Sequence, residues 1–192
     1  MKFVLASASP ARLATLQAAG LDPEVIVSGV DESSVASKTP TELVLKLAEL
    51  KCLAVAASRP GDLVLGCDSV LEFDGQILGK PKDPATARER WYQMRGNVGV
   101  LHTGHTLRLG GEEVSRHVST RVHFAQVSDA EIDAYIATGE PLEVAGAFTI
   151  DGLGGAFITR IDGDHHNVVG VSVPAVRELA ADLGIAWPTL WR

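Results

Sequence analysis

The sequence is poor in cysteine, in aromatic residues and in positive charge, and it contains no long apolar run. Its two cysteines, Cys52 and Cys67, form no Cys-x-x-Cys pair, so neither a zinc ribbon nor a disulfide framework fits. The 17 lysines and arginines are outnumbered by 24 aspartates and glutamates, which gives a net charge of −7. This balance argues against general binding to nucleic acids or anionic membranes, while a local basic pocket for a small anion is compatible with it.

No segment reaches the roughly 20 apolar residues that a membrane-spanning helix needs. The apolar run at the N-terminus is shorter than the roughly 7–15 residues of a signal peptide, so it predicts a buried strand and a cytoplasmic protein. Hydrophobic residues make up 46% of the sequence and charged residues 21%, which are ordinary values for a folded domain. We therefore expect residues 1–192 to form a single domain.

Short apolar segments and capped helices alternate along the chain. The expected strands are residues 2–6, 25–28, 63–67, 98–109, 112–124, 147–150 and 156–161, with a hairpin at 71–78 that turns at Asp74-Gly75. Helices are expected to begin at Pro10, Pro40, Pro84, Asp129 and Pro174. The second of these helices has an apolar stripe of Leu43, Leu47, Leu50 and Ala54. The pattern predicts an α/β fold with a mixed twisted sheet and flanking helices.

Several common functional motifs are absent or weak. Lys80 is followed by Pro81, so the chain has no phosphate-binding P-loop. The glycine-rich stretch 152–155 is not followed by a helix and indicates a tight turn instead of a dinucleotide site. Adjacent His165 and His166 favour a turn over a metal site, because neighbouring side chains in such a turn usually point apart.

One combination of residues can carry chemistry at a phosphate. Ser7 and Ser9 lie between the first strand and the first helix, and Arg12 lies in the first turn of that helix. Free backbone N–H groups, hydroxyls and a guanidinium together suit an anion. Asp68 is expected at the carboxyl end of a buried strand, where α/β proteins place their ligands. A carboxylate there can hold a divalent cation or deprotonate a water molecule.

Three further charged residues complete this set. Lys80 follows the hairpin, Lys51 lies on the second helix, and Glu32 lies in the polar loop before that helix. A triphosphate with Mg²⁺ needs carboxylates for the metal, cations for the phosphates and a base for water. Each residue also has an ordinary structural or surface interpretation, so only the combination is informative.

These residues lie in segments that resemble the signatures of the Maf family of nucleotide pyrophosphatases. The matching segments are SASPAR at 7–12, VDE at 30–32, CDSV at 67–70, LGKP at 78–81, HTG at 102–104, GAFTIDGLG at 146–154 and GDHHNVVG at 163–170. Lys51 stands where the family has a lysine in its first long helix. The segments follow the family's order over nearly the whole chain.

The resemblance implies two lobes around a central cleft, as in the Maf and ITPase-like folds. It implies hydrolysis of nucleoside 5′-triphosphates to monophosphate and pyrophosphate with Mg²⁺, Mn²⁺ or Co²⁺, by a cytoplasmic homodimer active in nucleotide housekeeping or division arrest. By the same analogy Asp68 activates water, and Glu32 and Asp68 hold the metal. The phosphates would be held by Ser7, Ser9, Arg12, Lys51 and Lys80.

Three positions depart from the family pattern. Ala11 stands where many members have an arginine, Ser69 where the pyrimidine-specific branch has threonine, and Asp151 where that branch has glutamine. The family uses the last two positions to sort bases. An ionised carboxylate only accepts hydrogen bonds, so Asp151 favours a base edge that donates, as in guanine or cytosine.

Two alternatives to an enzyme stay open at this point. A nucleotide-binding regulator of cell division would keep Ser7, Arg12 and the lysines but would not need Asp68. A division regulator that acts through a protein-binding surface would need none of these residues. The presence of Asp68 favours the enzyme.

Overall fold

The computed structural model describes all residues from Met1 to Arg192. Its strands are β1 (Phe3–Ala6), β2 (Glu24–Val25), β3 (Leu63–Phe73), β4 (Gln76–Leu78), β5 (Val98–Leu109), β6 (Glu112–Phe124) and β7 (Ile158–Asp162). They form one seven-stranded sheet in the order β2-β1-β3-β5-β6-β7, with β4 beside β3. β1 runs parallel to β2 and β3, whereas β4 and β7 pair antiparallel with β3 and β6. The predicted mixed sheet is confirmed.

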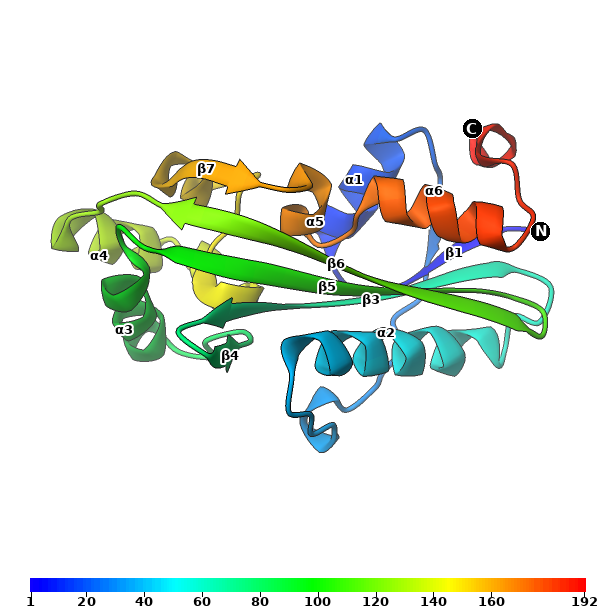
Figure 1. Cartoon of the computed structure of the whole chain (residues 1–192), viewed down its shortest axis with the longest axis horizontal. Helices are drawn as coiled ribbons and strands as arrows, with labels where there is room; N and C mark the ends of the chain where they lie inside the picture. The colour runs from blue at the N-terminus through cyan, green and yellow to red at the C-terminus, as the bar shows by residue number, and fades with distance from the viewer. The chain divides into compact units, whose positions relative to one another are not determined.

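The helices are α1 (Pro10–Ala18), α2 (Pro40–Ala56), α3 (Pro84–Met94), α4 (Asp129–Ala137), α5 (His165–Val169) and α6 (Val173–Asp182) (Figure 1). The sequence places a capping side chain before most of them. Ser9 caps α1, and Ser128 and Glu131 form a capping box at the start of α4. α5 was not predicted, because five residues are too few to show a helical period. No helix is both long enough and apolar enough to cross a membrane.

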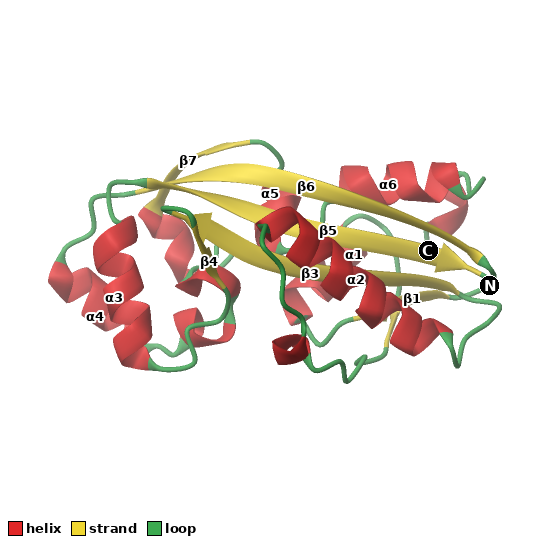
Figure 2. Cartoon of the chain, turned by 60° about the horizontal axis from the view of Figure 1, so that its bottom comes forward, coloured by secondary structure: helices red, strands yellow, loops and turns green.

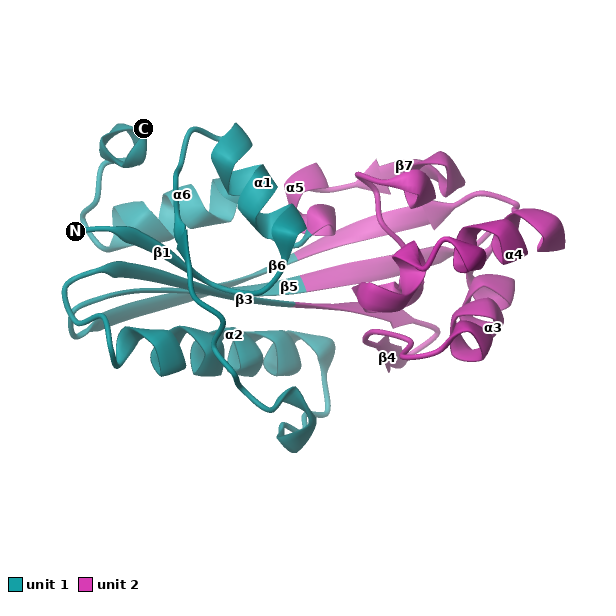
Figure 3. Cartoon of the chain, turned by 180° about the vertical axis from the view of Figure 1, so that it is seen from behind, with its two compact units in different colours: residues 1–68, 103–118, 170–192 teal, residues 69–102, 119–169 magenta.

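The chain divides into two compact units, residues 1–68, 103–118 and 170–192, and residues 69–102 and 119–169 (Figure 3). In unit 1, successive residues of β1 face opposite apolar layers. Phe3 and Leu5 pack with α1 and α6, whereas Val4 and Ala6 pack with α2 (Figure 1). Helices therefore cover both faces of the parallel strands, which explains why these strands are apolar without alternation.

Unit 2 is built around Trp91, on α3. Its ring meets Phe124, Tyr135 and Phe157 edge to face, with centroid distances of 5.7, 5.6 and 5.7 Å. The indole Nε1–H donates to the carbonyl of Ala147 at 2.8 Å. Helices α3 and α4 lie side by side in this unit (Figure 2). The buried residues of α3 are Ala87, Trp91 and Met94.

The strands predicted at 147–150 and 25–28 are absent and shortened, respectively. Residues 147–150 are not a strand, because Gly146 and Ala147 both adopt positive φ angles, 72° and 62°, and turn the chain. The Gly146 N–H donates to the carbonyl of Gly79 at 3.2 Å instead of to a neighbouring strand. The strand predicted at 25–28 is shorter than expected, since only Glu24–Val25 pairs with β1.

The predicted apolar stripe of α2 is wrong except for Leu47. The buried face consists of Val44, Leu47, Ala48, Lys51, Cys52 and Val55. Lys51 interrupts the apolar pattern of this face. The sequence therefore favoured the neighbouring stripe that contains Leu43 and Leu50.

Candidate active site

Asp68 lies inside a strand and not at its end, which corrects the sequence prediction. β3 continues past it to Phe73, because the hairpin at Asp74-Gly75 extends the strand. The parallel pairing with β1 nevertheless ends where Ala6 meets Gly66. Asp68 therefore lies just beyond the carboxyl end of the parallel part of the sheet, the position that the ligand argument requires.

One lysine ammonium bridges two carboxylates in unit 1. The Lys51 Nζ atom lies 2.6 Å from Asp68 Oδ1 and 2.5 Å from Glu32 Oε1. Lys51 and Asp68 are only 8% and 6% exposed, whereas about half of the Glu32 side chain is exposed. The structure thus brings together three of the predicted residues in a cluster that is buried on the Asp68 side and open on the Glu32 side.

Burial raises the pKa of Asp68 above its ordinary value. The positive charges of Lys51 and Arg12 pull the pKa down, and the negative charge of Glu32 pushes it up, but desolvation is the largest effect. A carboxylate with a raised pKa is a better proton acceptor than an exposed aspartate. The cluster therefore has the properties of a general base held by a lysine.

Two glycines let α2 carry Lys51 this close to the sheet. A Cβ atom on Gly66 of β3 would lie 2.2 Å from the Ala48 carbonyl oxygen, and one on Gly104 of β5 would lie 2.2 Å from that of Val44. Any side chain at either position would push the helix outward. The sequence analysis missed both roles, since a single glycine in a strand does not show which helix approaches it.

Arg12 is buried and holds three separate segments of unit 1. Its Nε donates to the Gly170 carbonyl at 2.7 Å, and its Nη1 donates to Ser7 Oγ and to the Cys67 carbonyl, both at 3.1 Å. The guanidinium thereby fixes the residue that precedes Asp68. These contacts make Arg12 a positioning residue; direct binding of a phosphate by Arg12 stays a prediction.

The serines of the first turn organise the start of α1. Ser9 Oγ accepts the Arg12 backbone N–H as the helix cap, and Ser7 Oγ accepts the Ser9 N–H at 3.2 Å. The predicted strand-to-helix turn is therefore confirmed, and Ser7 lies buried at its centre.

The other three predicted residues belong to unit 2. Lys80 is exposed. The preceding residue is held in place, since Arg90 Nη1 donates to the Gly79 carbonyl at 2.6 Å. Ser69 is half-buried directly after Asp68 in β3, and Asp151 is exposed on the glycine-rich turn.

The two cysteine thiols are buried and are not ionised near pH 7. Burial raises the pKa of Cys67 to about 11 and that of Cys52 to about 12, so both are neutral near pH 7. No group of three or more histidine, cysteine, aspartate or glutamate side chains is placed to hold a metal ion, and this includes the His165-His166 turn.

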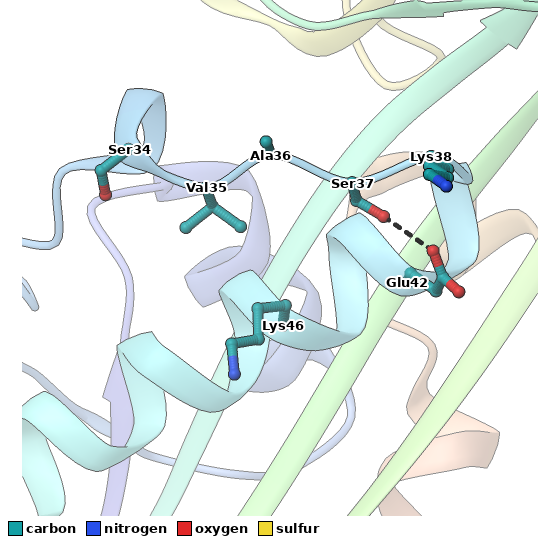
Figure 4. A pocket seen from close by; sticks show the side chains of 7 residues that line it. All are labelled: Ser34, Val35, Ala36, Ser37, Lys38, Glu42 and Lys46. Carbon is teal, nitrogen blue, oxygen red and sulfur yellow. Dashed lines mark hydrogen bonds between the residues drawn. The ribbon is translucent and has the colours of Figure 1, made fainter.

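A cavity of about 560 Å³ lies beside the start of α2. Its lining is Ser34, Val35, Ala36, Ser37, Lys38, Glu42 and Lys46 (Figure 4). The Ser37 hydroxyl donates to Glu42 Oε2 at 3.0 Å across its edge. None of the predicted site residues lines this cavity.

The structure defines a mixed α/β protein with a buried Asp68–Lys51 pair just beyond the parallel pairing of β1 and β3. The chain matches the family described as "Maf-like protein" over residues 2–183 and belongs to that family. It is 59% identical over its whole length to the "Nucleoside triphosphate pyrophosphatase" of Salinispora tropica, 88% of which is covered. It is 56% identical to the protein of the same name from Streptomyces coelicolor, with 99% of this chain and 94% of the relative covered.

A solved structure, "The structure of the Staphylococcus aureus Ham1 protein", is similar over the full length of this chain. The two proteins share 16% sequence identity, the TM-score is 0.49, and 94% of the Ham1 chain is covered.

Proposed function

We propose that this protein hydrolyses nucleoside triphosphates to nucleoside monophosphate and pyrophosphate. The proposal is carried by the buried Asp68–Lys51 pair beside the end of the parallel strands, in a chain of the Maf family. It is supported by the names of the relatives from Salinispora tropica and Streptomyces coelicolor.

In the proposed reaction Asp68 takes a proton from the attacking water. The water oxygen bonds to the α-phosphorus, as the family resemblance implies, and the bond from that phosphorus to the bridging oxygen breaks. Pyrophosphate leaves with the bridging oxygen, and the proton on Asp68 returns to solvent. The Lys51 ammonium keeps the carboxylate oriented, and the raised pKa of Asp68 favours proton transfer.

Ser7, Ser9, Arg12 and Lys51 are the proposed phosphate contacts of unit 1, together with the N-terminus of α1. The resemblance adds Lys80 for the phosphates and Ser69 and Asp151 for the base. Arg12 has a positioning role as well, because its guanidinium makes three hydrogen bonds to the protein.

A divalent cation fits the donors that are present. Glu32 and Asp68 already enclose one positive charge, the Lys51 ammonium, and Mg²⁺ is typically bound by one or two carboxylates plus substrate phosphates. Glu32 and Asp68 would hold Mg²⁺, Mn²⁺ or Co²⁺. The ion would polarise the phosphoryl oxygens and lower the pKa of a bound water.

The remaining parts of the proposal rest on the family resemblance. They are a single Maf-like domain, a homodimer, and a cytoplasmic role in nucleotide metabolism.

Product analysis tests the proposed activity. The wild-type protein is incubated with a panel of canonical and modified nucleoside triphosphates and Mg²⁺, Mn²⁺ or Co²⁺ in ¹⁸O-labelled water. The expected products are pyrophosphate and a monophosphate that carries the label, because water attacks the α-phosphorus. Release of inorganic phosphate and a diphosphate would contradict the proposal. Nucleotide binding without any hydrolysis would favour the non-catalytic regulator.

A further inference from the structure

The carboxylate of Glu140, in unit 2, is the centre of a hydrogen-bond network that the proposed reaction does not use. Its Oε1 accepts from the Tyr135 hydroxyl at 2.8 Å, from the Gly154 N–H at 3.0 Å and from the Thr149 hydroxyl. Its Oε2 accepts from the Leu153 N–H at 3.0 Å. Three of the four donors belong to the turn 149–155, so one side chain ties both ends of that turn.

Tyr135 anchors this network to the core. Its ring is packed against Trp91 and Phe157, and its hydroxyl accepts the Thr149 N–H at 3.2 Å while it donates to Glu140. Burial raises the pKa of Tyr135, so the hydroxyl keeps its proton. Partial burial also acts to raise the pKa of Glu140, but its four hydrogen bonds outweigh burial and lower that pKa, so the carboxylate stays charged.

The turn lies directly against these two side chains. A Cβ atom on Gly154 would lie 2.4 Å from the Tyr135 hydroxyl, and one on Gly152 would lie 2.7 Å from Glu140 Oε2. The backbone of the turn is thus fixed in contact with the glutamate. Asp151 is exposed between these contacts, and none of the hydrogen bonds that hold the turn uses its carboxylate.

We propose that Glu140 is the positioning residue for base selection: it holds the turn 149–155 so that the Asp151 carboxylate is presented in one fixed place. The inference rests on the proposed function, in which Asp151 contacts the base. A carboxylate offers only acceptors, so it favours a base edge with an amino group, such as that of guanine or cytosine, over uracil and thymine, whose single N3–H lies between two carbonyl oxygens. Selectivity then depends on how rigidly Asp151 is held.

Glu140→Gln is the informative substitution because it keeps the size of the side chain. One of the two terminal atoms becomes an NH₂ group, which cannot accept a hydrogen bond. If the amide oxygen keeps the three donors at the Oε1 position, the NH₂ group faces the Leu153 N–H and that hydrogen bond is lost. Glu143→Gln is the matched control, since Glu143 is exposed in the same short turn, Glu140–Glu143.

The test compares kcat and KM for GTP, CTP, UTP and dTTP in the wild type, Glu140→Gln, Asp151→Asn and the double variant. The wild type is expected to prefer GTP or CTP. Glu140→Gln is expected to raise KM for the preferred base on the order of tenfold, the effect of one charge-assisted hydrogen bond, with kcat nearly unchanged. The base selectivity of the double variant should be no lower than that of Asp151→Asn alone, because both changes act through the contact between Asp151 and the base.

A second measurement separates this inference from the proposed function. Amide hydrogen exchange at Leu153 and Gly154 is expected to speed up in Glu140→Gln but not in Glu143→Gln. If the wild type hydrolyses nothing, the proposed function fails, and equilibrium binding of the four nucleotides replaces kinetics as the measure of selectivity. The inference is overturned by unchanged amide exchange in Glu140→Gln, by a wild type without base preference, or by an equal loss for all four bases.

Discussion

The Lys51 ammonium lies 2.6 Å from the Asp68 carboxylate, and both groups are buried in unit 1. A buried charge pair of this kind is costly to break, because the group that is left behind has lost its solvent as well as its partner. The pair therefore links the stability of unit 1 to the proton affinity of the proposed base.

Loss of the lysine tests this link. We expect Lys51→Met to lower the free energy of unfolding by about 3–5 kcal/mol, the typical cost of removing one partner from a buried pair. The pKa of Asp68 should rise further, because the attraction of the ammonium is gone. Lys46→Met, an exposed position on the same helix, is the control, and denaturant unfolding is the measurement. Equal stability of the two variants would contradict the prediction.

The raised pKa of Asp68 predicts opposite effects of pH on stability and activity. Between the ordinary and the raised pKa the folded chain binds more protons than the unfolded chain, so the free energy of unfolding falls as the pH rises. Activity should rise over the same window, because ionisation creates the base. The acid limb of kcat/KM should therefore lie above the ordinary aspartate pKa of about 3.9.

Asp68→Asn is the reference for this pH experiment, since it removes the titrating group. Unfolding of the metal-free proteins is followed from about pH 3 to 8, the range that spans the ordinary aspartate pKa. The wild type should lose stability relative to Asp68→Asn as the pH rises through the window. An acid limb of kcat/KM at or below the ordinary aspartate pKa would contradict the prediction.

The close approach of α2 to β3 makes Gly66 sensitive to substitution. Gly66→Ala places a Cβ atom 2.2 Å from the Ala48 carbonyl oxygen, which forces the helix and Lys51 away from Asp68. We expect a loss of about 1–3 kcal/mol in stability, as in other overpacked cores, together with a lower kcat. Gly61→Ala is the control, because nothing lies within 4 Å of its Cβ position. Thermal unfolding and pyrophosphate release measure the two effects.

Arg12 offers a test between positioning and phosphate binding. A lysine at this position keeps the charge but cannot donate to Gly170, Ser7 and Cys67 together. If Arg12 mainly positions these segments, Arg12→Lys should lose about 1–3 kcal/mol of stability, whereas the exposed control Arg177→Lys should lose almost none. Unchanged stability with a raised KM would instead assign Arg12 to the phosphates.

The local parts of the fold could be predicted from the sequence because short-range chemistry determines them. Ser9 caps α1, and Ser128 and Glu131 form a capping box at the start of α4. Asp74-Gly75 forms the turn of the β3–β4 hairpin. Each of these features depends on residues within three or four positions of one another. The family motifs also led to the Asp68–Lys51–Glu32 cluster, which the structure brings together.

The parts that were missed depend on contacts between distant residues. Arg12 binds the carbonyl of Gly170, 158 positions away, and Gly66 is required only because α2 passes over it. The buried face of α2 was mispredicted because it contains Lys51. A sequence does not show whether a lysine is buried in an ion pair or exposed at the surface. Glu140 was also missed, because its hydrogen-bond donors, the N–H groups of Leu153 and Gly154, lie more than ten residues further along the chain.

The most direct test of the account is pyrophosphate release by Asp68→Asn, measured beside the wild type and the exposed control Asp133→Asn. Loss of the base should lower kcat by about 10²–10⁴, while folding and nucleotide binding persist. Asp133→Asn should match the wild type. Near-normal turnover by a folded Asp68→Asn protein would contradict the central claim that this buried carboxylate activates the water.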